Sequence, residues 1–376
     1  MRRLKPASIG FRPTWAEINL KNLGYNFRRI KALLRPGIKV MVCVKADAYG
    51  HGIVPVAKKL VSCGVDYLSV ASIGEGITLR QAGIKKPILV LGMILKEDAL
   101  PLLKYNLAQT VCSEELATAL NAIAGRSRKK INIHVKIDTG MGRLGVLAED
   151  AFGFVKKISA LKSLNIEGLF THISCADTNA DFTVYQIDIF NELTERLLKK
   201  GIRIPLVHAA NSLGLVNYPR SHFNMVRPGL VIYGLYPHES ISIDLKPVLS
   251  LKTRIIYFKK VPAGYGISYG HTYITKKKTT IVTLPIGYGD GYPHNLSNIA
   301  PVLIKGKRFT LSGRVCMDQI MVDVGNLKVK IGDEAVLIGS QGKNAIRTEE
   351  LAELSGTIPY EIVCGLGSRV PRVYLH

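Results

Sequence analysis

The sequence predicts an α/β protein of two domains: a (β/α)8 barrel of the TIM type over residues 12–240, followed by a mainly β-strand domain over residues 241–376. Three observations support this prediction. The chain has 376 residues, enough for a barrel of about 250 residues and a second domain. Short apolar runs alternate with amphipathic stretches along the first part of the chain. After Tyr236-Pro237 this alternation stops.

Eight runs in the first part read as buried strands because they are short, apolar and bounded by turn-forming residues. They cover 38–44, 66–71, 87–92, 108–112, 131–138, 166–173, 204–209 and 225–233. Helical spacing of apolar residues marks 20–34, 53–63, 114–123, 151–164 and 182–200. Strands that alternate with helices in this way indicate a parallel barrel.

The second part contains shorter runs, punctuated by Gly, Pro, Asn and Asp. The strand-like runs are 248–257, 280–284, 300–304, 308–311, 319–324 and 334–338, and only 348–354 has a helical pattern. This spacing is typical of an all-β domain.

Composition narrows the class of protein. Hydrophobic residues make up 47% of the chain, as in a folded globular protein. No apolar run reaches the length of about 18 residues that a membrane helix needs, and Met1-Arg2-Arg3 leads into no signal-peptide core. The six cysteines form no C-x-x-C pair, which suits a reducing compartment and offers no zinc site. We expect a cytoplasmic protein with no metal and no membrane contact.

The formal net charge of +23 is large enough to suit nucleic-acid binding. The basic residues are nevertheless dispersed, and the densest run, 276–278, reads as a solvated turn between two strands. We therefore expect no nucleic-acid partner, and interpret the charge as an aid to the capture of phosphate and carboxylate ligands.

The first predicted strand ends in a lysine, Lys45, followed by the turn-forming residues Ala46, Asp47 and Gly50. Burying an unpaired ammonium costs several kcal/mol or depresses its pKa. A lysine with a depressed pKa is an amine nucleophile of the kind that forms a Schiff base with an aldehyde cofactor. The alternative is a lysine that extends to the surface at a strand end.

Other unusual side chains fall at the ends of later strands, where barrel enzymes place their catalytic groups. Hydroxyl, amide and backbone N–H donors at Asn211, Ser212 and Gly229 follow the seventh and eighth strands, a frequent phosphate site in barrels. Ordinary loop chemistry is the alternative. Together with Lys45, these donors favour a phosphorylated aldehyde, pyridoxal phosphate.

Four further residues at strand ends have charged or aromatic side chains. His172 could stack on the cofactor or be a core histidine. Arg227 could face the pyridine nitrogen, which would then stay unprotonated because a guanidinium only donates hydrogen bonds. Lys136 and Arg143 are two cations near one site. A carbamate on Lys136 would invert its charge and hold Arg143, whereas pairing of Arg143 with Asp138 is the simpler alternative.

Five motifs together resemble the alanine racemase family: 44–52 (VKADAYGHG), 136–143 (KIDTGMGR), 208–212 (HAANS), 268–270 (SYG) and 314–319 (RVCMDQ). The resemblance extends in order from residue 15 to residue 372. It implies a pyridoxal-phosphate barrel with a β domain, in a head-to-tail homodimer whose active sites are shared. It also implies a racemase that interconverts L- and D-alanine with two bases and supplies D-alanine for peptidoglycan.

The resemblance further implies roles for individual residues. Lys45 would hold the cofactor and act as one base, and Tyr269 of the partner subunit would act as the other. The cofactor contacts would be Tyr49, His172, Asn211, Ser212, Arg227, Gly229 and Leu230. Arg143 and the backbone N–H of Met317 would contact the substrate carboxylate, with Lys136 carbamylated, and the substrate corridor would include Asp177, Tyr288 and Arg314.

Two departures from the family pattern bear on specificity. Ser368 stands where many relatives have a tyrosine that touches the phosphate, and His294 replaces an arginine of the corridor. A broad-specificity racemase on the same fold is therefore an alternative. A decarboxylase fits the pair Lys45 and Tyr269 poorly. A non-catalytic pyridoxal-phosphate carrier would resemble the barrel alone, so the β domain argues against it.

Overall fold

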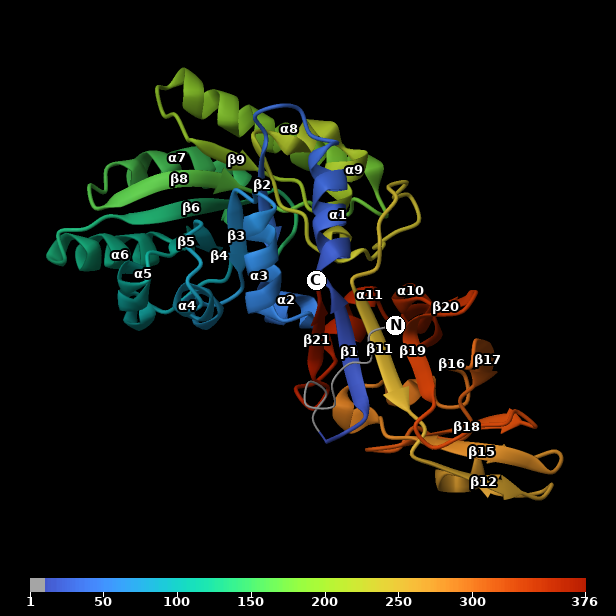
Figure 1. The fold of residues 1–376 in the computed structure, drawn as a ribbon. Helices are drawn as coiled ribbons and strands as arrows, with labels where there is room; N and C mark the ends of the chain where they lie inside the picture. The colour runs from blue at the N-terminus through green and yellow to red at the C-terminus, as the bar shows by residue number, and fades with distance from the viewer. Residues whose placement is uncertain (1–10) are drawn as a thin grey trace.

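Eight parallel strands form a closed barrel in the computed structural model, which describes residues 11–376 (Figure 1). The strand order is β5-β4-β3-β2-β10-β9-β8-β6, and pairing of β5 with β6 closes the ring. The barrel strands are β2 (Lys39–Cys43), β3 (Tyr67–Val70), β4 (Ile88–Val90), β5 (Ala108–Val111), β6 (Ile131–Asp138), β8 (Leu164–Phe170), β9 (Leu206–His208) and β10 (Met225–Val226). The predicted barrel is confirmed.

Helices surround the barrel, and α1, α3, α6, α7 and α8, which the sequence spacing predicts, each bury an apolar stripe. In α8, for example, Ile187, Phe190, Leu193 and Leu197 are buried at helical intervals. Several helices begin with a side-chain cap, such as Asn179 of α8, whose Oδ1 accepts the Phe182 N–H. The helices are α1 (Leu20–Lys31), α3 (Ile53–Ser62), α4 (Ile73–Gln81), α5 (Leu100–Lys104), α6 (Glu114–Arg126), α7 (Ala148–Ser159), α8 (Ala180–Lys199) and α9 (Ser212–Asn217).

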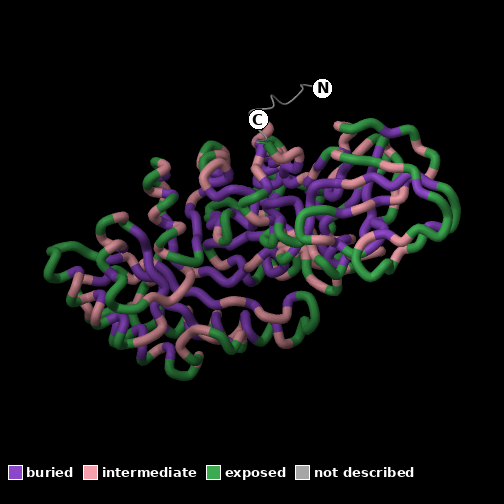
Figure 2. Tube along the Cα trace, turned by 90° about the horizontal axis from the view of Figure 1, so that it is seen from below, coloured by how far each residue is buried: buried purple, intermediate pink, exposed green. Residues whose placement is uncertain are grey.

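The barrel interior has an apolar layer. Met41, Tyr67, Leu89, Leu206 and Met225 pack together although they come from five different strands, so their side chains meet inside the ring. A much larger apolar cluster fills the space between strands and helices and continues into the second domain. Figure 2 shows that the buried residues lie in the interior of the molecule along the length of both domains. The barrel is thus a packed core.

The second domain contains a six-strand path with the order β17-β16-β19-β11-β1-β21, to which β20 adds at β19. A separate three-stranded sheet, β12-β15-β18, lies at the far end of the molecule from the barrel (Figure 1). The strands are β1 (Thr14–Asn19), β11 (Leu249–Arg254), β12 (Tyr257–Val261), β13 (Gly266–Ile267), β14 (Tyr273–Ile274), β15 (Thr279–Leu284), β16 (Pro301–Ile304), β17 (Lys307–Thr310), β18 (Ile320–Gly325), β19 (Glu334–Gln341), β20 (Asn344–Ile346) and β21 (Arg372–Leu375).

The two ends of the described chain meet in this sheet, which the sequence analysis did not anticipate. Strand β1 pairs antiparallel with β11 and parallel with β21, so that Ala16 lies opposite both Leu251 and Arg372. The chain therefore starts in the second domain's sheet and enters the barrel only through α1.

Several elements, such as α4, α5 and β12, were not predicted, and two further differences bear on the site. The eighth strand was expected over 225–233, but β10 ends at Val226 and Leu230–Tyr233 form the 3-10 helix η4. Pro228 has no N–H for the ladder, and the Gly229 N–H is bound to the Ser212 hydroxyl, so strand pairing ends there. The helix α10 (Thr348–Leu354) is confirmed, but it is not alone, because α11 (Pro359–Cys364) follows it. Six residues are too few to show a periodic pattern.

One buried asparagine links the helix α1 to the segment that joins the domains. The Asn26 amide donates to the carbonyls of Ile232 (3.1 Å) and Lys246 (2.8 Å), and its Oδ1 accepts the Lys246 N–H at 2.8 Å. Asn26 is fully buried, so water cannot replace these partners.

Asn26→Ala should lower the free energy of unfolding by about 2–4 kcal/mol, because it leaves buried backbone groups without partners. Asn22→Ala is the matched control. It removes one hydrogen bond of the same helix, from the Asn22 amide to the Pro247 carbonyl, and this bond is exposed to solvent. Urea denaturation of both variants measures the difference, and equal losses would contradict the role given to Asn26.

Candidate active site

A cavity of about 290 Å³ lies at the carboxyl ends of the barrel strands. Lys45 enters it after β2, Lys136 from β6, His172 after β8, and Arg227 after β10. The cavity brings together nine of the residues predicted from the sequence: Lys45, Tyr49, Lys136, Arg143, His172, Asn211, Ser212, Arg227 and Gly229. They lie up to about 180 positions apart in the chain and meet because parallel strands share one edge.

Lys45 begins a tight turn, α2 (Lys45–Gly50), with an unusual backbone. The four residues Ala46 to Tyr49 all have left-handed dihedral angles, with φ between 52° and 54°. The Asp47 carboxylate accepts the Ile53 N–H at 2.8 Å, and the Asp47 carbonyl accepts the Gly52 N–H at 2.9 Å, which holds the far end of the turn. This turn carries both Lys45 and Tyr49 into the cavity.

Small polar groups, with the hydroxyls of Ser212 and Tyr49 among them, cluster on one side of the cavity. The Ser212 hydroxyl accepts the Gly229 N–H at 3.0 Å, and Asn211 caps α9 by accepting the Gly214 N–H at 2.9 Å. A Cβ at position 229 would stand 2.8 Å from the Tyr49 hydroxyl oxygen, so glycine is required there. Burial raises the pKa of Tyr49 well above its ordinary value, which keeps its hydroxyl protonated. The arrangement is a cradle for an anion. Leu230, which was predicted beside it, is fully buried, and its side chain does not line the cavity.

The guanidinium of Arg227 lies at the base of the cavity and is almost fully buried. It donates to the carbonyls of Thr171 (2.7 Å) and Ala209 (3.0 Å) and to Nδ1 of His208 (2.7 Å). Its Nη2 also lies 3.4 Å from Nδ1 of His172. Burial lowers the pKa of Arg227 to about 10, so the group remains a cation near neutral pH.

These contacts fix the tautomers of a chain of histidines. Arg227 only donates, so Nδ1 of His208 accepts and its Nε2 carries the proton toward Nδ1 of His134, 2.9 Å away. His134 then carries its proton on Nε2, which faces the Glu167 carboxylate at 3.5 Å. Burial, followed by the Arg227 charge, lowers the pKa of His208 well below its ordinary value. Arg227 is thus backed by neutral imidazoles.

Lys136 and Arg143 line the opposite part of the cavity. Burial, then the charges of Arg227 and Arg143, lower the pKa of Lys136 to about 8. The Asp138 carboxylate accepts the backbone N–H groups of Gly140 (2.9 Å) and Met141 (2.8 Å), and no ion pair joins it to Arg143 in the described part of the chain. The simpler alternative, an Arg143–Asp138 pair, is therefore wrong, since the loop backbone occupies that carboxylate.

The sequence analysis missed Tyr360, which reaches the cavity from α11 in the second domain. Its ring centroid lies 5.9 Å from that of Tyr49. Burial raises its pKa to about 12, with smaller contributions from Cys43 and Asp177. By contrast, Ser368 is exposed and lies outside the cavity lining. Tyr360 could have been identified only if the helix α11 had been predicted, and the sequence pattern did not predict that helix.

The remaining predicted residues do not join the cavity within one chain. Tyr269 and Met317 line a separate, shallow hollow of the β domain, with side chains 70% and 53% exposed. Tyr288 and Arg314 are also exposed on this domain, and the ring of His294 lies 6.1 Å from that of Tyr288. Asp177 is exposed on the barrel and close enough to affect Tyr360.

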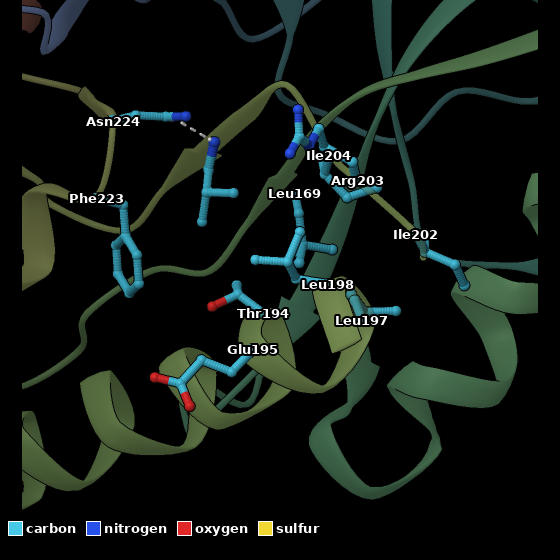
Figure 3. A pocket seen from close by; sticks show the side chains of 11 residues that line it. Leu169, Thr194, Glu195, Leu197, Leu198, Ile202, Arg203, Ile204, Phe223 and Asn224 are labelled. Carbon is cyan, nitrogen blue, oxygen red and sulfur yellow. Dashed lines mark hydrogen bonds between the residues drawn. The ribbon is translucent and has the colours of Figure 1, made fainter. Parts of the chain in front are cut away.

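A further cavity of about 280 Å³ lies outside the barrel, between the end of α8 and strands β8 and β9 (Figure 3). Leu169, Leu198 and Phe223 give it a mainly apolar lining, with Glu195 projecting from α8. It contains none of the predicted site residues. The barrel mouth therefore remains the candidate active site.

The residues around that site fit pyridoxal phosphate. A lysine amine is available for an aldehyde, the cradle at Ser212 and Gly229 offers donors and a close backbone approach for a phosphate, and Arg227 offers a cation in the base. Among the described residues lining the cavity there are four cations and no carboxylate. A ligand with several negative charges matches this set.

The fold and this cavity define a barrel enzyme whose site combines a lysine nucleophile with an anion cradle. Two family models match the chain: the alanine racemase N-terminal domain over residues 18–237 and the alanine racemase C-terminal domain over residues 248–374. The chain therefore belongs to the alanine racemase family.

Individual relatives agree with this assignment. The alanine racemase of Halothermothrix orenii is 50% identical, and the match covers 96% of this chain and 97% of the relative. That of Carboxydothermus hydrogenoformans is 47% identical over 97% of this chain and 100% of the relative. Among solved structures, alanine racemase of Clostridium difficile 630 is 42% identical with a TM-score of 0.92, covering 96% of each chain. Alanine racemase of Bacillus anthracis with bound L-Ala-P is 36% identical with a TM-score of 0.92, covering 97% of this chain and 96% of that one.

With CO₂ excluded from the buffer, Lys136 should react with cyanate at pH 8 at least about tenfold faster than exposed lysines such as Lys156. With a pKa of about 8, roughly half of its amine is neutral at that pH, whereas an ordinary lysine is neutral in fewer than about one molecule in a hundred. Peptide mapping by mass spectrometry after short exposure measures the rates. Raising the pH from 6 to 8 should increase the Lys136 rate steeply, and equal rates at Lys136 and Lys156 would contradict the lowered pKa.

Proposed function

We propose that this protein interconverts L-alanine and D-alanine with pyridoxal phosphate as its cofactor. One observation supports this most directly: a strand-end lysine, an anion cradle and a buried arginine share one cavity, in a member of the alanine racemase family. The likeness to relatives named alanine racemase over nearly the whole chain supports alanine as the substrate.

The cofactor would be held by Lys45, by the cradle of Tyr49, Asn211, Ser212, Gly229 and Leu230, and by His172 and Arg227. When bound, pyridoxal phosphate conjugates the substrate's amine with an electron-poor ring and so acidifies the hydrogen on the α-carbon. Arg227 can only donate hydrogen bonds, so a pyridine nitrogen beside it stays unprotonated. This moderates the electron withdrawal of the ring and limits side reactions.

Racemisation requires one base on each face of the α-carbon, one to remove the proton and one to return it. Lys45 supplies an amine on one face. Tyr269 lies outside the cavity of its own chain and is 70% exposed, so we propose that it acts in the cavity of a second copy. The protein would then be a homodimer whose two sites each combine Lys45 with Tyr269 of the partner subunit.

Arg143 and the backbone N–H of Met317 in a second copy would bind the substrate carboxylate. A lysine whose pKa is about 8 is a good acceptor for CO₂, and we propose that Lys136 carries a carbamate. Its negative charge would then face Arg143 and relieve the repulsion among Lys136, Arg143 and Arg227. Asp177, with Tyr288 and Arg314 from a second copy, would line the path of the substrate.

The proposed biological role is the supply of D-alanine for peptidoglycan in the cytoplasm. Across residues 11–376, no helix is both long and apolar enough to cross a bilayer. A broader substrate range on the same site is the second candidate, favoured by the histidine at position 294, where some members of the family have an arginine in the corridor.

The decisive experiment incubates L-alanine with cofactor-loaded protein in deuterated water. D-alanine with deuterium at the α-carbon is the expected product, because the base on the opposite face returns a deuteron that it has taken from the solvent. Serine and other amino acids, tested in the same way, measure the breadth of specificity. Loaded protein that leaves alanine unchanged would refute the proposal.

Lys45→Ala should abolish attachment of the cofactor and racemisation, and Tyr269→Phe should slow the L-to-D direction most strongly. Mixing the two variants should restore about one quarter of the wild-type activity, since random pairing gives about half hybrid dimers, each with one intact site of two. Tyr265→Phe, on the same loop region, is the control. A mixture that regains nothing would contradict a shared active site.

A further inference from the structure

The turn that carries Lys45 has a backbone conformation that its own sequence does not favour. Ala46, Asp47, Ala48 and Tyr49 are consecutive residues with φ between 52° and 54°. A left-handed conformation costs roughly 1–2 kcal/mol for each residue with a side chain, and only Asp among these four is tolerant of it. Groups outside the turn must therefore hold it in place.

The start of the turn is held by a side chain from the first turn of α4. The Glu75 carboxylate accepts the Ala46 N–H at 2.6 Å through Oε1. Through Oε2 it accepts the N–H groups of Ala71 (2.7 Å) and Ser72 (3.3 Å). One carboxylate thus joins the turn after β2 to the loop after β3, and its contact with Ala46 lies one residue beyond Lys45.

Glu75 is itself well oriented for this contact. It lies in the first turn of α4, where its N–H donates to the Ser72 hydroxyl at 3.3 Å while its carboxylate returns to the Ser72 N–H, a reciprocal cap. A charged acceptor forms stronger hydrogen bonds than a neutral one. The cap alone explains the contacts to Ala71 and Ser72, but the contact to Ala46 contributes nothing to α4.

We propose that Glu75 is a positioning residue for Lys45: its carboxylate fixes the peptide that follows the lysine and so holds the lysine amine in the cavity. Asp47 secures the far end of the same turn, and Glu75 secures the near end. The proposal rests on the proposed function, because it assigns Glu75 to the alignment of the residue that would hold the cofactor.

Glu75→Gln tests the proposal, and Ser72→Ala is its matched control. A glutamine replaces the charged carboxylate by a neutral amide, whose single oxygen is a weaker acceptor and cannot serve both Ala46 and the Ala71–Ser72 loop, so the Ala46 contact is lost or weakened. Ser72→Ala removes the hydroxyl from the cap of α4 and leaves the Glu75 contact with Ala46 intact. Both variants weaken the same helix start, and only the first disturbs the Lys45 turn.

The first readout needs neither cofactor nor activity. In the cofactor-free protein, hydrogen exchange of the Ala46 amide should become about tenfold or more faster in Glu75→Gln and stay near wild type in Ser72→Ala. Should Glu75→Gln fail to fold, Glu75→Asp keeps the charge and shortens the reach by one methylene. Unchanged Ala46 exchange in a folded Glu75 variant would overturn the proposal.

The second readout concerns the loaded enzyme. Glu75→Gln should release the cofactor faster and lower kcat by about tenfold or more, with a smaller change in KM, and should shift the pH profile of the visible absorbance of the bound cofactor. If Glu75→Gln and Ser72→Ala had equal effects, the role of Glu75 would be only to cap α4, and the proposal would be overturned. Protein that fails to racemise alanine, yet shows the Ala46 and cofactor effects, would support the positioning role and refute the proposed function.

Discussion

The burial of the Arg227 charge is the constraint around which the site is built. A buried guanidinium is stable only if its donors are satisfied, and the carbonyls of Thr171 and Ala209 with the His208 ring provide for this. These partners stand at the ends of adjacent barrel strands, so closure of the barrel creates the binding place for the cation. Burial together with that cation keeps the pKa of His172 well below its ordinary value, and the ring remains neutral beside the cavity.

The second domain completes the cavity because the last part of the chain packs against the Lys45 turn. The Arg372 guanidinium donates to the Gly50 carbonyl at 3.0 Å and to the carbonyls of Leu366 and Gly367. A Cβ at position 50 would collide with the Val363 carbonyl, so glycine permits this close approach. The same packing delivers Tyr360. The parallel pair β1–β21 then fixes the end of the chain to its beginning, which explains why a cavity in the barrel depends on residues 360–372.

Much of this architecture could be predicted from the sequence, because the barrel strands are short apolar runs and several of them end at or just before a lysine, an arginine or a histidine. Lys45, Lys136, Arg143 and Arg227 were all found from that rule, and the cavity contains all four. What could not be predicted depends on distant partners. Tyr360 belongs to a six-residue helix with no periodic signal, and the left-handed turn at Ala46–Tyr49 is held by Glu75 from the first turn of α4. That Tyr269 of a second copy reaches the cavity remains a prediction, since the Tyr269 side chain is exposed in the single chain.

The cavity also illustrates why a site need not be stabilising in the protein alone. Among the described residues, four cations and no carboxylate line the cavity. Burial lowers the pKa of Lys136, and repulsion from the neighbouring cations lowers it further. The carboxylates nearest in sequence serve the backbone instead: Asp138 binds its own loop, and Asp47 binds the Lys45 turn. Every anionic group that enters therefore gains attraction from charges already ordered by the fold. A phosphate, a substrate carboxylate and a carbamate would each relieve part of the same repulsion, so each one that is bound should reduce the attraction left for the next.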